Sequence, residues 1–168
     1  MVDVRAVAVR LRRRRRVVAD PVLPDGVCRA PFTSMYLDQH GSVRACCQNS
    51  GTLLGDIATA TIREVWESAS ADRLRGALEH DDYGEGCQFC GWQLAEGNES
   101  ILFARDYDEP APVQRRPRWP ERMEFALTNT CNLQCVMCNG EWSSAIRSRR
   151  ERRAPLPAAY GEAFFAEL

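Results

Sequence analysis

Hydrophobic and polar positions alternate with a period of two over the first well-patterned part of the chain. Residues 34–39 predict a short strand, His40 and Gly41 predict a turn, and residues 42–46 predict a second strand that returns as its hairpin partner. Two helices are then expected, because apolar residues recur there at helical spacing. These residues are Ile62, Val65 and Trp66 in the first helix and Leu74 and Leu78 in the second. Ser70 is the predicted cap of the second helix.

A second patterned part begins after residues 106–120, which contain four prolines and have the composition of a linker. Residues 122–128 alternate again and predict a strand with one apolar face. That face carries Met123, Phe125 and Leu127, and a further helix is marked by Tyr160, Phe164 and Leu168. The predicted organisation is a tail (1–24), a folded segment (25–105), the linker, and a second segment (121–168).

The composition limits how much core such a chain can build. Leu, Ile, Val and Phe make up 35 of the 168 residues, close to the fraction below which chains stop folding by apolar burial alone. A cofactor or a further chain is therefore expected to add stability. No stretch approaches the roughly 20 apolar residues of a membrane span, so we expect a soluble protein without a membrane partner.

Charge is distributed unevenly along the chain. The first 16 residues hold seven arginines and one aspartate, whereas the remainder has 15 basic and 22 acidic residues. The body is thus mildly acidic, and nucleic acid is not its expected partner. For the arginine-rich tail we favour a solvated segment, and the alternative is an arm that binds nucleic acid or an acidic protein.

Eight cysteines decide the chemical class. The sequence after the arginine run is too short for the apolar core of a secretion signal, so we expect the reducing cytoplasm, where clustered cysteines usually bind metal. Cys131, Cys135 and Cys138 lie within eight residues, a spacing that can present three thiolates to three irons of one [4Fe–4S] cluster. No fourth cysteine follows, which leaves one iron open. Zinc is the alternative, but zinc ribbons pair two knuckles about 15–20 residues apart, whereas 44 residues separate Cys90 from Cys135.

The segment Glu124–Cys138, EFALTNTCNLQCVMC, resembles the first strand and cluster loop of radical S-adenosylmethionine (radical SAM) enzymes. The resemblance implies an α/β fold in which this strand, the loop and the start of the first helix open a partial (β/α)6 barrel. It also implies that Cys131, Cys135 and Cys138 bind a [4Fe–4S] cluster. The open iron would bind S-adenosylmethionine and cleave it reductively to a 5′-deoxyadenosyl radical. Met137 stands where that superfamily often has an aromatic residue.

The first folded segment resembles the SPASM/Twitch iron–sulfur domain. Cys28, Gly41 and Cys46 match its opening, with 12 residues between Cys28 and Gly41 and with Cys46 five positions after Gly41; Cys87 and Cys90 follow in its usual order. The resemblance implies that Cys28, Cys46, Cys87 and Cys90 bind one auxiliary [4Fe–4S] cluster, the Twitch arrangement, here placed before the barrel. Such a cluster with four protein ligands would relay electrons or support the fold. An electron donor of the flavodoxin or ferredoxin type is the expected partner.

Several alternatives stay open at this point. Cys47 could replace Cys46 as a ligand, although we expect it to be a buried apolar thiol. Trp92 is either a shield for the cluster or an ordinary packing residue. His40 and His80 are expected in a turn and at a helix end. Three residues after the cluster loop, Ser143, Ser144 and Arg147, are expected to be helix-start serines and a solvated arginine.

The function also has alternatives. A non-catalytic zinc or iron–sulfur scaffold is one, and an inactive, shortened product of a radical SAM gene is another. Since the expected barrel is barely begun, we predict that this chain alone has no pocket for S-adenosylmethionine and does not turn it over. The substrate, a small molecule or a peptide, is not identified by the sequence.

Overall fold

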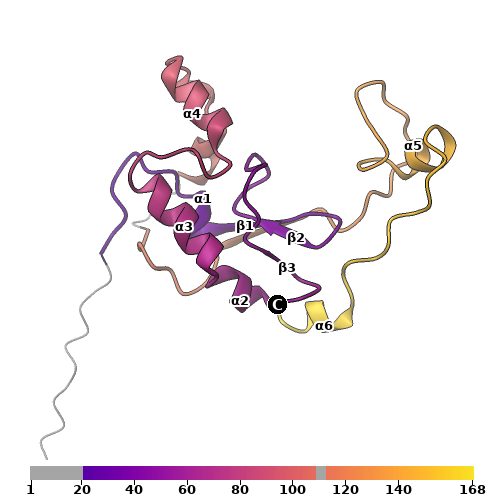
Figure 1. Cartoon of the computed structure of the whole chain (residues 1–168), viewed down its shortest axis with the longest axis horizontal. Helices are drawn as coiled ribbons and strands as arrows, with labels where there is room; N and C mark the ends of the chain where they lie inside the picture. Colours follow the sequence, from indigo (N-terminus) through magenta and orange to yellow (C-terminus); the bar gives the residue numbers. More distant parts are fainter. Residues whose placement is uncertain (1–20, 109–112) are drawn as a thin grey trace, which may run out of the picture.

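The computed structural model describes residues 21–108 and 113–168. Most of the predicted arginine-rich tail, residues 1–20, lies outside the described residues. At the centre is a four-stranded mixed sheet (Figure 1) with the strand order β3-β2-β1-β4. Its strands are β1 (Ser34–Leu37), β2 (Ser42–Arg44), β3 (Gly55–Asp56) and β4 (Arg122–Phe125).

The predicted hairpin is confirmed, although its strands are shorter than expected. β1 and β2 pair antiparallel, with Leu37 opposite Val43. β1 ends at Leu37 because the Asp38 carboxylate accepts hydrogen bonds from the backbone N–H groups of His40 (2.9 Å) and Ser42 (3.1 Å). These bonds close the turn before the strand can continue.

β4 is part of the same sheet as the hairpin. It pairs parallel to β1, with Met35 opposite Met123, and it forms the edge of the sheet. The described residues show this small mixed sheet and no barrel. The apolar face of the predicted strand is incompletely covered, as expected, at Phe125 (39 % exposed) and Leu127 (42 % exposed). Met123 differs, since it is half-buried against the core.

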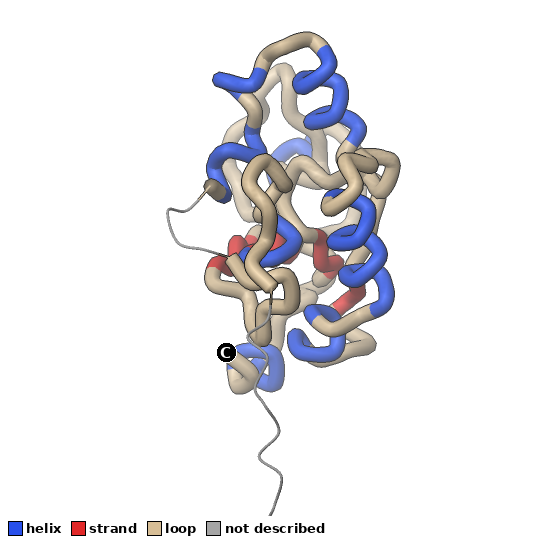
Figure 2. Tube along the Cα trace, turned by 90° about the vertical axis from the view of Figure 1, so that its left-hand side faces the viewer, coloured by secondary structure: helices blue, strands red, loops and turns tan. Residues whose placement is uncertain are grey.

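Three helices lie beside the sheet (Figures 1 and 2): α1 (Ala30–Thr33), α2 (Ile62–Trp66) and α3 (Ala69–Leu78). Thr61 and Glu64 form a capping box at the start of α2. The predicted cap of α3 is wrong by two residues. Ser68, in extended conformation, accepts the hydrogen bond from the Ala71 N–H, whereas Ser70 already lies inside the helix.

The hydrophobic core lies between these helices and the sheet. Its fully buried members include Phe32, Met35, Leu37, Val43, Val65, Trp66 and Leu74. The Arg75 side chain is also buried there, with its guanidinium 4.4 Å from the centre of the Trp66 ring and its Nε donating to the Pro31 carbonyl at 2.9 Å. The guanidinium thus keeps a cation–π contact and a hydrogen bond in place of water.

The described part of the proline-rich segment, residues 113–120, packs on this body. Val113 is buried and its carbonyl accepts from the Leu23 N–H at 2.7 Å. The Trp66 Nε1 donates to the Pro117 carbonyl at 3.0 Å, and Arg115 forms a two-pronged ion pair with Glu79. Linker composition therefore does not mean a free segment here; Pro110 and Pro112 lie outside the described residues.

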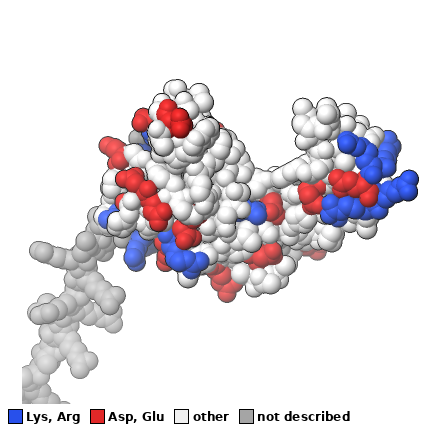
Figure 3. Space-filling view, turned by 45° about the horizontal axis from the view of Figure 1, so that its top comes forward, with Lys and Arg blue, Asp and Glu red and all other residues white. Residues whose placement is uncertain are grey.

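Five further short elements complete the described part of the chain. They are α4 (Gln88–Ala95), the 3-10 helices η1 (Glu99–Ile101) and η2 (Phe103–Tyr107), α5 (Ser144–Arg149) and α6 (Glu162–Phe165). α4 and α5 project on opposite sides in Figure 1, and Figure 3 shows charged side chains gathered at the right-hand end of the molecule. α6 is shorter than predicted: Phe164 is buried, but Leu168 is 58 % exposed because the helix ends at Phe165. No helix among the described residues is long and apolar enough to cross a membrane.

Candidate metal centre

Four cysteines from three separate segments line one small cavity. Cys28 precedes α1, Cys46 follows β2, and Cys87 and Cys90 lie at the start of α4. They are the four cysteines that the sequence grouped together. The rest of the lining comprises Ala30, Gln48, Asn49, Leu78, Tyr83, Phe103, Ala104 and Tyr107. Cys47 does not line this cavity, and it is exposed rather than buried as expected.

Burial governs the acidity of these thiols. It raises the pKa of Cys28 and of Cys46 to about 12 and that of Cys87 to about 11, and it also raises the pKa of Cys90. Charges on the neighbouring cysteines add to the effect at Cys28 and Cys46. The metal-free thiols are therefore protonated at neutral pH, and a metal must displace those protons to bind.

The four thiols suit an iron–sulfur cluster chemically, but the cavity between them is small. Four thiols that face an apolar, half-closed cavity are the ligands that such clusters use. The free volume is only about 20 Å³, roughly one water molecule. Tyr83 and Phe103 border the cavity and are half-buried, and the free space beside the thiols is smaller than a cluster core. As placed, no three Cys, His, Asp or Glu side chains within the described ranges could hold one metal ion.

The predicted cluster loop, Cys131–Cys138, is held in place by two serines that follow it. The Ser144 hydroxyl accepts from the Cys131 N–H at 3.1 Å and donates to the Cys131 carbonyl at 3.0 Å. The Ser143 hydroxyl donates to the Leu133 carbonyl at 2.7 Å, and it also caps α5 by accepting from the Ile146 N–H. Both serines therefore begin the helix, as predicted, and in addition fix the backbone of the loop.

The loop presents its side chains outward. Cys135 is exposed, while Cys131 and Cys138 are half-buried. Val136 and Met137 are 89 % and 88 % exposed, far more than apolar side chains normally are. The three thiols thus lie at the surface of the chain, where a bound group would meet solvent or another surface.

A cavity of about 570 Å³ lies beside Cys131, between the loop and α5. It is bordered by residues 127–132, by α5 and by residues 155–158, and Gln39 reaches it from the hairpin turn. Its volume is within the range of small-molecule sites. The expectation that this chain alone has no pocket for S-adenosylmethionine stays a prediction, because the cavity borders only one of the three cysteines of the loop.

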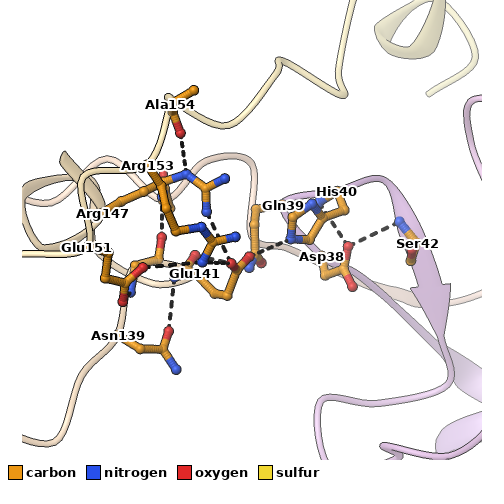
Figure 4. Close-up of polar contacts among 12 residues, drawn as sticks. Asp38, Gln39, His40, Ser42, Asn139, Glu141, Arg147, Glu151, Arg153 and Ala154 are labelled. Atoms are coloured by element: carbon orange, nitrogen blue, oxygen red, sulfur yellow. Dashed lines mark hydrogen bonds and ion pairs between the residues drawn. The ribbon is translucent and has the colours of Figure 1, made fainter.

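A polar network joins the cluster-loop region to the hairpin turn (Figure 4). At its centre the Glu141 carboxylate lies 3.0 Å from His40 Nε2, 2.7 Å from Arg153 and 3.1 Å from Arg147. Hydrogen bonds and charge from Arg153, and then from His40 and Arg147, hold the pKa of Glu141 below its ordinary value. Gln39 adds a bond of 3.1 Å from its amide to the Glu141 carbonyl.

Arg147 differs from the sequence expectation, whereas the two histidines agree with it. Arg147 is buried, not solvated, and its Nε donates to the Ala154 carbonyl at 2.5 Å. His40 lies in the hairpin turn, as predicted, and His80 follows α3, with its Nδ1 2.8 Å from the Gly76 carbonyl oxygen.

Sequence reasoning missed several residues at the four-cysteine cavity. Asn49, Tyr83, Phe103 and Tyr107 border it, whereas Trp92, the aromatic residue singled out from the sequence, is 55 % exposed and does not line it. Asn49 is 1 % exposed and its Nδ2 lies 3.3 Å from the Cys87 sulfur. Its position three residues after Cys46 is the one sequence signal that could have drawn attention to it.

Comparison with known families supports the chemistry of this region. Residues 28–91 match the SPASM domain, an iron–sulfur cluster-binding domain. The matched span includes all four cysteines of the cavity. The match supports iron–sulfur cluster binding by this part of the chain, and SPASM domains are typical of radical SAM proteins. The match ends before the Cys131–Cys138 loop. No curated protein and no solved structure matched the chain.

Proposed function

We propose that this protein is of the radical SAM class and carries two [4Fe–4S] clusters. Cys28, Cys46, Cys87 and Cys90 hold the auxiliary cluster, and the Cys131–Cys138 loop holds the second one through its three cysteines. The observation that carries the proposal is the cavity that collects four cysteines from three distant segments inside the SPASM match. A relay or structural role suits this auxiliary site, because all its ligands come from the protein.

The cluster loop supports the catalytic half of the proposal. Cys131 of the loop borders a cavity of small-molecule size, and Ser143 and Ser144 fix the backbone of the loop. When bound, a three-cysteine cluster supplies an electron and one open iron for the reductive cleavage of S-adenosylmethionine. The residues of this chain hold the loop, shape the cavity and place the arginines of α5 at its edge.

A reducing cytoplasmic location and a small electron-transfer protein as donor belong to the same proposal. All eight cysteines lie within the described residues and none forms a disulfide. Thiols in this state are the form that binds iron.

Reconstitution without oxygen tests the auxiliary site. The chain is incubated with iron and sulfide, and bound iron, sulfide and electron paramagnetic resonance (EPR) spectra are recorded. Cys46→Ala is expected to lose the auxiliary cluster, whereas Cys47→Ala, its exposed neighbour outside the cavity, is expected to keep it. Stoichiometric zinc without iron in the reconstituted protein would contradict the proposal.

The second site is tested by adding a strong reductant and S-adenosylmethionine and measuring 5′-deoxyadenosine. From the sequence we expect this chain alone to give no useful turnover; several turnovers per protein that Cys135→Ala abolishes would show instead that the chain is competent and that the loop carries the reaction. Product that persists in Cys135→Ala would show that cleavage does not use the loop.

A further inference from the structure

Asn49 is the buried polar side chain closest to the ligand sulfurs, and it joins segments that are far apart in the sequence. Its Nδ2 donates to the Glu85 carbonyl at 3.0 Å and to the Cys87 sulfur at 3.3 Å. Its Oδ1 accepts from the Thr52 N–H at 2.9 Å. Both ends of the amide are therefore occupied, and the side chain has one orientation.

The backbone of Asn49 contacts a second cysteine, Cys46. Its N–H donates to the Cys46 carbonyl at 3.3 Å, and together with the N–H of Gln48 it also faces the Cys46 thiol. One residue thus contacts two of the four predicted ligands, which come from segments about forty positions apart in the sequence.

The turn before Cys87 is shaped to receive this side chain. Gly86 has a φ of +80°, and a Cβ there would lie 2.5 Å from the Asn49 Oδ1 and 2.8 Å from the Thr52 nitrogen. Only glycine allows the two backbones to approach so closely. The contact between Asn49 and the Cys87 turn is therefore specified from both sides.

From this geometry we propose that Asn49 is a positioning residue that aligns Cys46 with Cys87 and raises the reduction potential of the auxiliary cluster. The inference rests on the proposed function, because it concerns a cluster bound at these cysteines. Reduction adds negative charge to a cluster, and an N–H donor to a ligand sulfur stabilises the more negative state. Buried as it is, the amide keeps this bond without competition from water.

The substitution Asn49→Asp tests the contribution of the side-chain N–H donor. It keeps the size and the Oδ1 acceptor for the Thr52 N–H, and it loses the N–H donor to the Cys87 sulfur. Gln48→Glu is the matched control, since Gln48 borders the same cavity and the change introduces the same charge. Gln48 is exposed, so that solvent screens its charge.

The experiment uses the full chain with Cys131, Cys135 and Cys138 changed to Ala, so that only the auxiliary cluster contributes. Iron and sulfide contents show whether that cluster is present, and an EPR-monitored redox titration gives its potential. We expect Asn49→Asp to disfavour reduction about tenfold, which is about 59 mV for one electron. Gln48→Glu should shift the reduction potential by less than a third of the shift expected for Asn49→Asp. Absence of bound iron in the parent chain would refute the proposed function itself. Equal shifts in the two variants, or none, would overturn the role of Asn49 alone.

A second measurement avoids any substitution at Asn49. The same chain is labelled with ¹⁵N in the asparagine side-chain amides, reduced, and studied by pulsed EPR. A ¹⁵N coupling that is absent from a sample labelled only at the glutamine amides is the expected result. An identical spectrum from both samples would overturn the proposal, whether or not Asn49→Asp folds.

Discussion

Gly86→Ala is the substitution whose cost the structure defines best. Gly86 lies directly before Cys87, in the left-handed region with a φ of +80°. A side chain in that conformation costs about 1–2 kcal/mol. The added Cβ would also lie 2.8 Å from the backbone nitrogens of Gly51 and Thr52, which cannot move without disturbing the loop. Such overpacking costs about 1–3 kcal/mol more, so the expected loss of unfolding free energy is about 2–5 kcal/mol.

Two other glycines provide controls for this prediction. Gly97 also has a positive φ, +72°, but nothing lies within 4 Å of a Cβ placed there. Gly97→Ala should therefore lose only about 1–2 kcal/mol. Gly76 lies inside α3 with equally open space, and Gly76→Ala should gain about 0.5–1 kcal/mol from helix propensity.

Urea unfolding of the three metal-free variants, followed by circular dichroism, measures these differences. With a slope of about 1–3 kcal/mol/M, a loss of about 3 kcal/mol moves the midpoint by about 1–3 M. The order from most to least stable should be Gly76→Ala, the parent chain, Gly97→Ala and Gly86→Ala. If Gly86→Ala unfolds at the same urea concentration as Gly97→Ala, the close approach around Gly86 does not exist and the argument from it is refuted.

Further predictions concern the two cysteine sites and the polar network around Glu141. Cys87→Ala combined with Cys90→Ala should remove about half of the bound iron and destabilise residues 26–105, since ligation adds to folding free energy; complete loss of iron in a folded variant would contradict the ligand assignment. Ser144→Ala should lower the unfolding free energy by about 0.5–1.5 kcal/mol, because it removes both side-chain bonds to Cys131, and retained stability by urea unfolding would argue against that role. Glu141→Gln should increase hydrogen exchange in residues 126–158, whereas Glu96→Gln, an exposed carboxylate after α4, should not. Because the folded pKa of Glu141 is lowered, its stabilisation is complete above the ordinary carboxyl pKa of about 4.3 and is lost as the pH falls through the lower folded value; an NMR pH titration should show this loss in the parent chain and not in Glu141→Gln.

Local sequence patterns predicted the elements that depend on neighbouring residues. The β1–β2 hairpin follows from alternation on both sides of a His-Gly turn, and α2 follows from helical spacing after a Thr cap. Errors at this level are small. Ser68 caps α3 in place of Ser70, because several serines there could serve and the backbone conformation selects one.

The grouping of the cysteines came from a family resemblance. The resemblance to the SPASM/Twitch domain implied that Cys28, Cys46, Cys87 and Cys90 belong together, and the fold brings these four to one cavity. The spacing after Gly41 favoured Cys46 over Cys47 as the ligand. The fold agrees with that preference, since Cys46 borders the cavity and Cys47 is exposed outside it.

Only the tertiary structure decided how the two halves of the chain meet. β4 pairs with β1 across more than eighty residues, and Glu141 reaches His40 across about a hundred. Edge strands offer the same backbone groups whatever their side chains, so no local pattern indicates which strand they accept. The partners of Asn49 could not be predicted for a similar reason. From the sequence, an isolated asparagine indicates only a turn, and the fold brings Gly86 and Cys87 against it.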